Sequence, residues 1–124
     1  MESCIFCKIA KKEISSKIIY ENKDIVVFSD IKRAAPKHYL IVSKRHIKSI
    51  NHIKTKDSEL ITEIIFTAQK IAKKLKLKGY KLVFNVGREG GQTIDHLHLH
   101  LLGGWSKRAD TESINKTIAS KSWR

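Results

Sequence analysis

The stretch that decides the fold is His96-Leu97-His98-Leu99-His100-Leu101-Leu102, in which histidines alternate with leucines. Successive side chains of a β-strand point to opposite faces, so we expect the leucines to face a core and the histidines to line the other face. Histidine has the side-chain pKa nearest neutrality, and such a row can supply nucleophiles, acids, bases and metal ligands. A solvated strand is the plain alternative, but a solvated face in so lysine-rich a chain would more naturally carry Lys, Thr or Glu.

Composition bounds the class of protein. The chain has 124 residues, 41% of them hydrophobic, with a single proline, which suits one globular domain around one core. The formal charge of +13 arises from 25 Lys and Arg against 12 Asp and Glu, and most of the excess is scattered lysine. This charge fits a solvated surface and only weakly favours nucleic acid, although it would attract a phosphorylated small molecule.

The chain has no apolar run of the kind that targets or anchors a protein. Its first twelve residues include Glu2, Lys8, Lys11 and Lys12, and no segment approaches the roughly 20 apolar residues of a membrane span. We therefore expect a cytoplasmic protein.

Periodicity predicts an α+β arrangement of five strands and one long helix. Apolar residues recur at helical spacing over residues 58–77, and Asp57 or Ser58 can cap the start of this helix while Gly79 can end it. A short helix or turn is expected over residues 4–11. Strands are expected at residues 18–20, 25–28, 39–42, 81–86 and 94–102. Three glycines between the last two strands permit a tight bend, although this loop alone is a weak sign of phosphate binding.

Residues 90–104, which read Gly-Gly-Gln-Thr-Ile-Asp followed by the histidine stretch and Gly103-Gly104, resemble the histidine-triad (HIT) superfamily. The motif of that superfamily is His-φ-His-φ-His-φ-φ, where φ is apolar. The resemblance covers about residues 4–104 and extends to residues 4–9, 28–31, 36–42, 44–47 and Asn85. It implies a HIT fold with a five-stranded antiparallel sheet, a long helix, a short N-terminal helix and a two-fold dimer. We expect one HIT domain at residues 1–104 and a divergent tail at residues 105–124.

The residues after the triad are similar to those of the Hint branch, the nucleoside phosphoramidate hydrolases. Dinucleoside polyphosphate hydrolases of the superfamily commonly continue with Pro-Arg, whereas this chain has Gly103-Gly104. Nucleotidyl transferases commonly carry Gln at the last triad position, where this chain has His100. The resemblance thus implies hydrolysis of nucleoside 5′-phosphoramidates and aminoacyl-adenylates. Dinucleoside polyphosphate hydrolysis is the alternative within the enzyme class, and a zinc-stabilised basic adaptor for nucleotides or nucleic acid is the alternative outside it.

The same resemblance implies catalytic roles. His98 would attack the α-phosphorus and form a nucleotidyl-histidine, which divides one difficult displacement into two easier ones. His38 would bond to or orient His98 and fix its tautomer, and His100 would contact the phosphate. Thr93 would assist departure of the amine, which is a poor leaving group and needs a proton.

Substrate contacts follow from the resemblance as well. Asn85, Gly91, Gln92 and nearby backbone amides would bind the phosphoryl charge, and Asp30 would hold the ribose hydroxyls of a purine nucleotide. The base would be walled by Phe6, Ile9, Phe28, Ile31 and Leu40. Each of these five apolar residues, taken alone, also fits an ordinary core.

A second group of residues has the composition of a metal site. Cys4-x-x-Cys7 can supply two thiolates of a tetrahedral zinc site, and zinc-bearing relatives of the superfamily add histidines at the positions of His46 and His96. Free thiols are the alternative, and a redox pair is less favoured because the thioredoxin-like setting is missing. Asp95 departs from the family pattern, which usually has Tyr or Phe there, and its role stays open.

Overall fold

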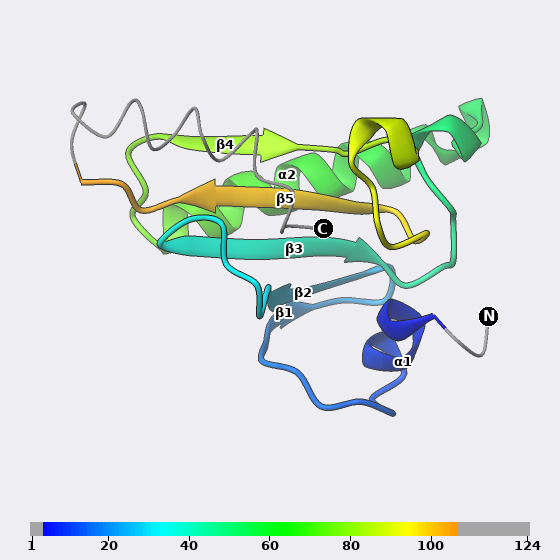
Figure 1. The fold of residues 1–124 in the computed structure, drawn as a ribbon, viewed down its shortest axis with the longest axis horizontal. Helices are drawn as coiled ribbons and strands as arrows, with labels where there is room; N and C mark the ends of the chain where they lie inside the picture. Colours follow the sequence, from blue (N-terminus) through cyan, green and yellow to red (C-terminus); the bar gives the residue numbers. More distant parts are fainter. Residues whose placement is uncertain (1–3, 107–124) are drawn as a thin grey trace.

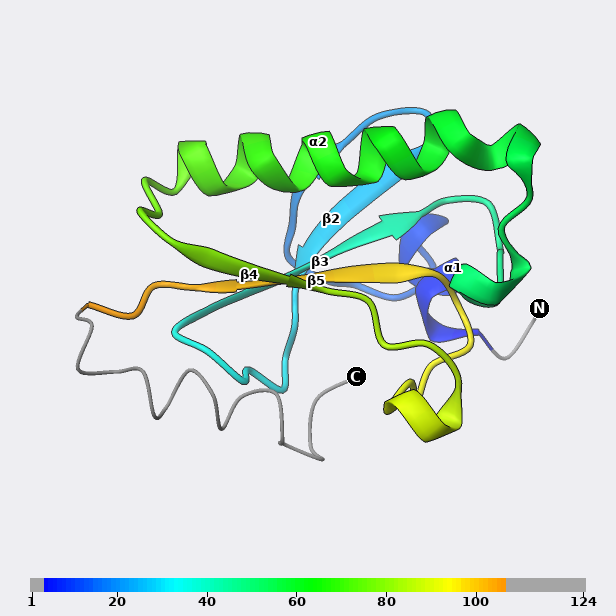
Figure 2. The ribbon, with the colours of Figure 1, turned by 90° about the horizontal axis from the view of Figure 1, so that it is seen from above.

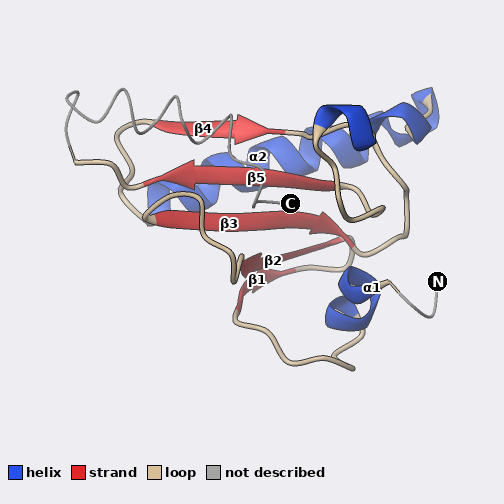
Figure 3. Ribbon diagram, in the orientation of Figure 1, coloured by secondary structure: helices blue, strands red, loops and turns tan. Residues whose placement is uncertain are grey.

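The computed structural model describes residues 4–106, and a five-stranded antiparallel sheet forms its centre (Figure 1). The strand order is β1-β2-β3-β5-β4, so the two edges are β1 and β4. The strands are β1 (Ile18–Glu21), β2 (Ile25–Ser29), β3 (Lys37–Ser43), β4 (Tyr80–Val83) and β5 (His98–Gly103). The helices are α1 (Ile5–Ala10) and α2 (Ser58–Lys74), with short 3-10 turns at Ile50–His52, Thr55–Asp57 and Arg88–Gly90 (Figure 3). The expected α+β class and antiparallel sheet are confirmed.

Both faces of the sheet are covered. α2 runs along one face (Figure 2), where its buried residues pack against Leu97, Leu99 and Leu101 as the alternation predicted. The opposite face carries the histidines, and α1 packs on it over β2 and β3, where Phe6 and Ile9 join a second cluster. The triad histidines are therefore buried instead of lining a solvated face.

The start of β5 and the end of β4 differ from the boundaries that the sequence predicted. β5 begins at His98 instead of residue 94, because Leu97 donates its amide to the carbonyl of Ile47 and leaves the ladder. β4 ends at Val83 instead of residue 86, where its pairing with β5 stops.

The end of α2 also differs from the prediction. Lys76, not Gly79, adopts the left-handed conformation, with φ of 59°. The amide of Lys76 bonds to the carbonyl of Lys73 and that of Leu77 to Ala72, which is the hydrogen-bond pattern of a Schellman motif. At the other end, the side chain of Asp57 makes no capping bond to α2.

Gly103 and Gly104 have a local packing reason. A Cβ on Gly103 would lie 2.9 Å from Cδ1 of Leu77, and one on Gly104 would lie 2.9 Å from Cγ of Lys37. Gly104 also has a positive φ of 89°. No helix within residues 4–106 is long and apolar enough to span a membrane. The tail expected at residues 105–124 lies mostly outside the described residues.

Candidate active site and metal centre

His98 is held by the backbone of its own strand. Its Nδ1 lies 2.6 Å from the carbonyl oxygen of His96, and the side chain is 3% exposed. Since a carbonyl oxygen only accepts, we assign the proton to Nδ1. The lone pair of a neutral ring then lies on Nε2, so Nε2 is the nitrogen that can act as a nucleophile.

His100 is held in the opposite sense by a second histidine. The amide of Ala34 donates to Nδ1 of His38 at 3.0 Å, so the proton of a neutral His38 is on Nε2. Nε2 of His38 lies 2.8 Å from Nδ1 of His100, which therefore accepts, and the proton of His100 is on Nε2. His38 was expected to bond to or orient His98; in the structure Nε2 of His38 lies against His100, and the carbonyl of His96 orients His98.

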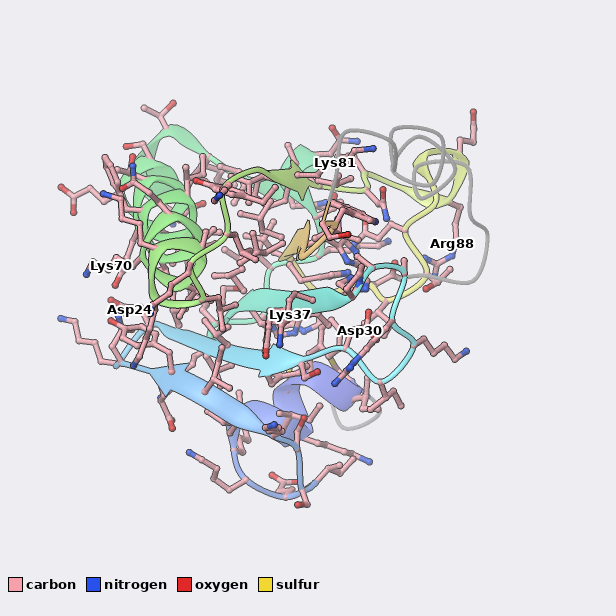
Figure 4. The ribbon with its side chains drawn as sticks, turned by 90° about the vertical axis from the view of Figure 1, so that its left-hand side faces the viewer. Asp24, Asp30, Lys37, Lys70, Lys81 and Arg88 are labelled. Atoms are coloured by element: carbon pink, nitrogen blue, oxygen red, sulfur yellow. The ribbon has the colours of Figure 1, made fainter. Side chains whose placement is uncertain are left out.

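Asp30 lies beside this pair. It follows β2 at the turn that leads to β3 (Figure 4), and its Oδ2 is 3.5 Å from Nε2 of His38. Oδ1 accepts from the amide of Lys32 at 2.9 Å, and the residue is 1% exposed. The carboxyl group expected at the ribose is thus packed against the pair of His38 and His100.

The expected wall of the base is mostly core. Phe6 packs edge-on against the rings of His98 and Phe28, with centroids 5.0 and 5.4 Å away. Four of the five wall residues belong to the histidine-face cluster: Phe6, Ile9, Phe28 and Leu40. Ile31 differs, because it is 80% exposed. The structure therefore places an apolar layer directly against His98, with Ile31 outside that layer.

The loop at residues 87–95 uses the expected phosphate-binding groups internally. The amides of Gly91 and Gln92 donate to the carbonyls of Arg88 and Gly87, and the side chain of Gln92 is fully hydrogen-bonded inside the protein. The groups expected to bind the phosphoryl charge therefore hold the loop together in this structure. Asn85 is half-buried under Gly91, and Thr93 is exposed.

An ion pair in this loop was not foreseen. Arg88 donates two parallel hydrogen bonds to the carboxylate of Asp95, at 2.9 and 3.1 Å. Arg88 lies on the side of the molecule away from α2 (Figure 4). The spacing of seven residues across a glycine-rich bend carries no periodic signal, so sequence patterns alone could not pair them.

Four predicted metal ligands come together at the start of α1. Their donor atoms all lie within 4.8 Å of one another, and they are Cys4, Cys7, His46 and His96. The closest approaches are 3.2 Å between Sγ of Cys7 and Nδ1 of His46, 3.3 Å between Sγ of Cys4 and Nδ1 of His96, and 3.1 Å between the two imidazole nitrogens. A tetrahedral zinc ion, with bonds of about 2.0–2.1 Å to N and about 2.3 Å to S, separates its ligand atoms by about 3.3–3.8 Å. The cluster therefore has the donors and nearly the spacing of a zinc site.

The ring of His96 is oriented for this role. Its Nε2 lies 2.6 Å from the carbonyl of Ser43, so that nitrogen is protonated and Nδ1 presents a lone pair to the cluster. Burial lowers the pKa of His96 to about 4 and, together with the neighbouring Cys4, raises that of Cys7 to about 11. The imidazole is thus neutral at pH 7, as a metal ligand must be, whereas the thiol of Cys7 would need a cation to ionise.

Comparisons with known proteins identify the family of this chain. The family model described as "Scavenger mRNA decapping enzyme C-term binding" matches residues 3–114. The chain is 41% identical over 104 residues to protein HitA of Neisseria gonorrhoeae, covering 83% of this chain and 97% of that one. A HIT family hydrolase from Legionella pneumophila Philadelphia 1 superposes with a TM-score of 0.81 at 48% identity, covering 84% of this chain and 95% of that one. The chain belongs to the histidine-triad family.

A more distant structure shares the fold alone. The Zn-bound histidine triad family protein from Mycobacterium smegmatis is 21% identical with a TM-score of 0.74, covering 95% of this chain and 94% of that one.

Proposed function

We propose that this chain is a hydrolase that cleaves the P–N bond of nucleoside 5′-phosphoramidates and the mixed-anhydride P–O bond of aminoacyl-adenylates through a covalent nucleotidyl-histidine. The observation that carries the proposal is that Nδ1 of His98 faces a carbonyl oxygen whereas Nδ1 of His100 faces Nε2 of His38, from which we assign a lone pair to Nε2 of His98 and a proton to Nε2 of His100. One ring suits attack on phosphorus and the other suits donation to an oxygen or a leaving group.

The first step exchanges one bond at phosphorus for another. The lone pair on Nε2 of His98 forms the P–N bond to the α-phosphorus, and the bond from phosphorus to the substrate amine breaks. The electron pair stays with the departing nitrogen, which takes a proton and leaves as the amine. Thr93 is proposed to relay that proton, and His100, oriented by His38, is proposed to donate to the phosphoryl group.

Water completes the reaction. Its oxygen bonds to phosphorus, the bond to His98 breaks, and the electron pair returns to Nε2. One proton of the water replaces the proton spent on the amine, so the histidines end as they began. The product is a nucleoside monophosphate. For aminoacyl-adenylates the bond broken is the mixed-anhydride P–O bond, and the leaving group is the carboxylate of the amino acid.

The apolar layer and the buried carboxylate support a purine nucleotide as substrate. Phe6 and Phe28 give the histidine face an aromatic wall, and we propose that Asp30 reaches the ribose hydroxyls when the turn after β2 adjusts. The contacts within the loop favour Asn85 over the side chain of Gln92 for the phosphoryl group, because Gln92 is already bonded.

Dinucleoside polyphosphate hydrolysis remains the second candidate, and Gly103-Gly104 disfavours it only through the resemblance to the Hint branch. A basic adaptor is the third, and the ordered triad disfavours it, because an adaptor has no need of two histidines held in opposite tautomers.

We also propose that Cys4, Cys7, His46 and His96 hold one zinc ion. The donor set, the spacing and the neutral His96 support it, and the Mycobacterium smegmatis relative is described as Zn-bound. Bound zinc would supply a structural cross-link between α1 and the segments before β5 and after β3. No step of the reaction passes through it.

A homodimer is proposed from the exposed apolar residues of α2 and β4. Phe66 is 56% exposed and Ile65 44%, while Leu82 on the edge strand β4 is 39% exposed. Leu82 pairs with Leu101, on the sheet face that α2 covers. Within the part of the chain that the structure describes, β4 is an edge strand, and an edge strand and an apolar helix surface on the same side suit self-association about a two-fold axis.

The deciding experiment compares kcat/KM for an adenosine phosphoramidate with that for a diadenosine polyphosphate. The proposal expects the phosphoramidate to be the better substrate. More efficient cleavage of the polyphosphate would establish the second candidate, and cleavage of neither, combined with salt-dependent DNA binding, would favour the adaptor.

A further inference from the structure

Thr93 lies in a loop that is braced from inside by its neighbour. Gln92 is 2% exposed, and its Oε1 accepts from the amide of Gly87 at 2.9 Å. Its Nε2 donates to the carbonyls of Lys48 and Ile94, at 2.8 and 2.9 Å. One amide side chain therefore joins the beginning of the loop, its end and the segment after β3.

A second brace closes the same loop from outside. Arg88 donates to both carboxylate oxygens of Asp95, and its Nη1 also donates to the carbonyl of Gln92 at 2.5 Å. The points of attachment, Gln92 and Asp95, lie on either side of Thr93 in the chain. Arg88 and Asp95 are exposed, at 62% and 45% of their side chains, so this pair contributes little to stability, whereas a bidentate contact fixes geometry well.

We propose that Arg88 and Asp95 are positioning residues that hold Thr93 in place for cleavage of P–N bonds. The inference rests on the proposed function, in which Thr93 relays a proton to the leaving amine. Proton transfer requires hydrogen-bond distance, and a small displacement of the relaying group costs rate steeply. This role would explain the carboxylate of Asp95, at a position where the family pattern described above usually has Tyr or Phe.

The experiment uses two substrates that differ in their need for a proton. The alkylamine of an adenosine 5′-phosphoramidate needs one to leave, whereas the p-nitrophenolate of adenosine 5′-p-nitrophenyl phosphate does not. Asp95→Asn preserves shape and removes the ion pair. Glu21→Gln is the matched control. It removes an exposed carboxylate at the end of β1 that is paired with Lys12 and Lys44.

We expect Asp95→Asn to lower kcat/KM for the phosphoramidate about tenfold and to change that for the ester by less than about twofold. Arg88→Lys should have an intermediate effect, because it keeps the charge and loses the parallel bonds. In a Thr93→Ala background, Asp95→Asn should have no further effect on the phosphoramidate. An equal loss on both substrates, or a loss that persists in full without Thr93, would overturn the positioning role.

Hydrogen exchange at the Gln92 amide, which precedes Thr93 and donates to the carbonyl of Gly87 at 3.0 Å, tests the brace without substrate. Exchange should be faster in Asp95→Asn than in the wild-type protein and unchanged in Glu21→Gln. Unchanged exchange in Asp95→Asn overturns the brace even where phosphoramidate is cleaved. If exchange is faster in Asp95→Asn but the wild-type protein cleaves no phosphoramidate, the proposed function and the catalytic role of the brace are overturned. The brace itself then stands as a structural feature.

Discussion

His98 and His100 stand two residues apart on one strand, yet the same ring nitrogen meets a different kind of partner in each. Nδ1 of His98 faces the carbonyl of His96 at 2.6 Å, and Nδ1 of His100 faces Nε2 of His38 at 2.8 Å. The first partner can only accept and the second donates, so the two rings expose opposite chemistry from one face of β5.

These tautomers can be observed directly. Imidazole ¹⁵N spectra of the free protein near pH 7 should show His98 protonated at Nδ1 and His100 at Nε2. In His38→Ala, His100 loses the donor that holds its tautomer and should become a mixture, while His98 keeps its own. A change at His98 in this variant would contradict the assignment.

Loss of the proposed nucleophile should separate turnover from binding. His98→Ala is expected to lower kcat for a phosphoramidate by at least about a thousandfold, because the covalent step is gone, and to keep nucleotide affinity within about tenfold. Steady-state kinetics and calorimetric titration with a nucleoside monophosphate measure the two effects. Near wild-type turnover would sink the covalent mechanism.

The metal proposal predicts composition and stability together. Protein purified without added metal should contain about one zinc per chain, and chelation should lower Tm by at least about 5 °C because zinc binding is coupled to folding. Cys4→Ser should abolish both the zinc and the effect of the chelator. Metal analysis near zero, with Tm insensitive to chelator, would refute the site.

Glu21 should make stability depend on acid pH. Hydrogen bonds from Lys12 and Lys44 lower its pKa from 4.5 to about 2. Between these values the unfolded chain binds the proton more readily, so the stabilisation is complete above pH 4.5 and is lost as the pH falls toward 2. Tm of Glu21→Gln should therefore fall less steeply over this range. Glu13→Gln, at another exposed site, should behave as wild type; equal slopes in all three proteins would contradict the prediction.

The proposed dimer contact should be sensitive to charge. Phe66→Asp places a carboxylate in the exposed apolar surface of α2 and is expected to give monomers at micromolar concentration, without loss of helical content, because the site is 56% exposed. Light scattering gives the mass and circular dichroism the fold. A variant that keeps the mass of the wild-type dimer would move the interface elsewhere, and a monomeric wild-type protein would exclude it.

Sequence periodicity predicted the regular strands and the long helix. It missed the side-chain contacts and backbone conformations that leave no periodic pattern. The alternation around His98 predicted a strand with buried leucines, and helical spacing predicted α2, because burial imposes a regular pattern on both. The bond between His38 and His100 joins β3 to β5 and depends on sheet register, which a strand pattern does not specify. The left-handed residue that follows α2, Lys76, was not predicted because a lysine in this conformation leaves no compositional signal.

The candidate site divides in the same way. The resemblance to the family named the metal ligands, and the structure brings all four together. The resemblance also suggested that Gln92 binds phosphate, whereas its side chain makes hydrogen bonds to Gly87, Lys48 and Ile94. Asp95 was open because its partner, Arg88, is reached only through the conformation of the glycine-rich loop.

The three triad histidines lie in two different sites, so the metal cluster and the catalytic site can be engineered separately. His96 turns its lone pair to the cysteine cluster, while His98 and His100 belong to the apolar layer and the histidine relay. The ligands around His96 can be exchanged for a well-packed apolar plug and selected for thermal tolerance alone. Thr93, in the glycine-rich loop, can be varied for new leaving groups in a separate library, because Gln92 and Arg88 hold that loop and it contributes no residue to the cysteine cluster.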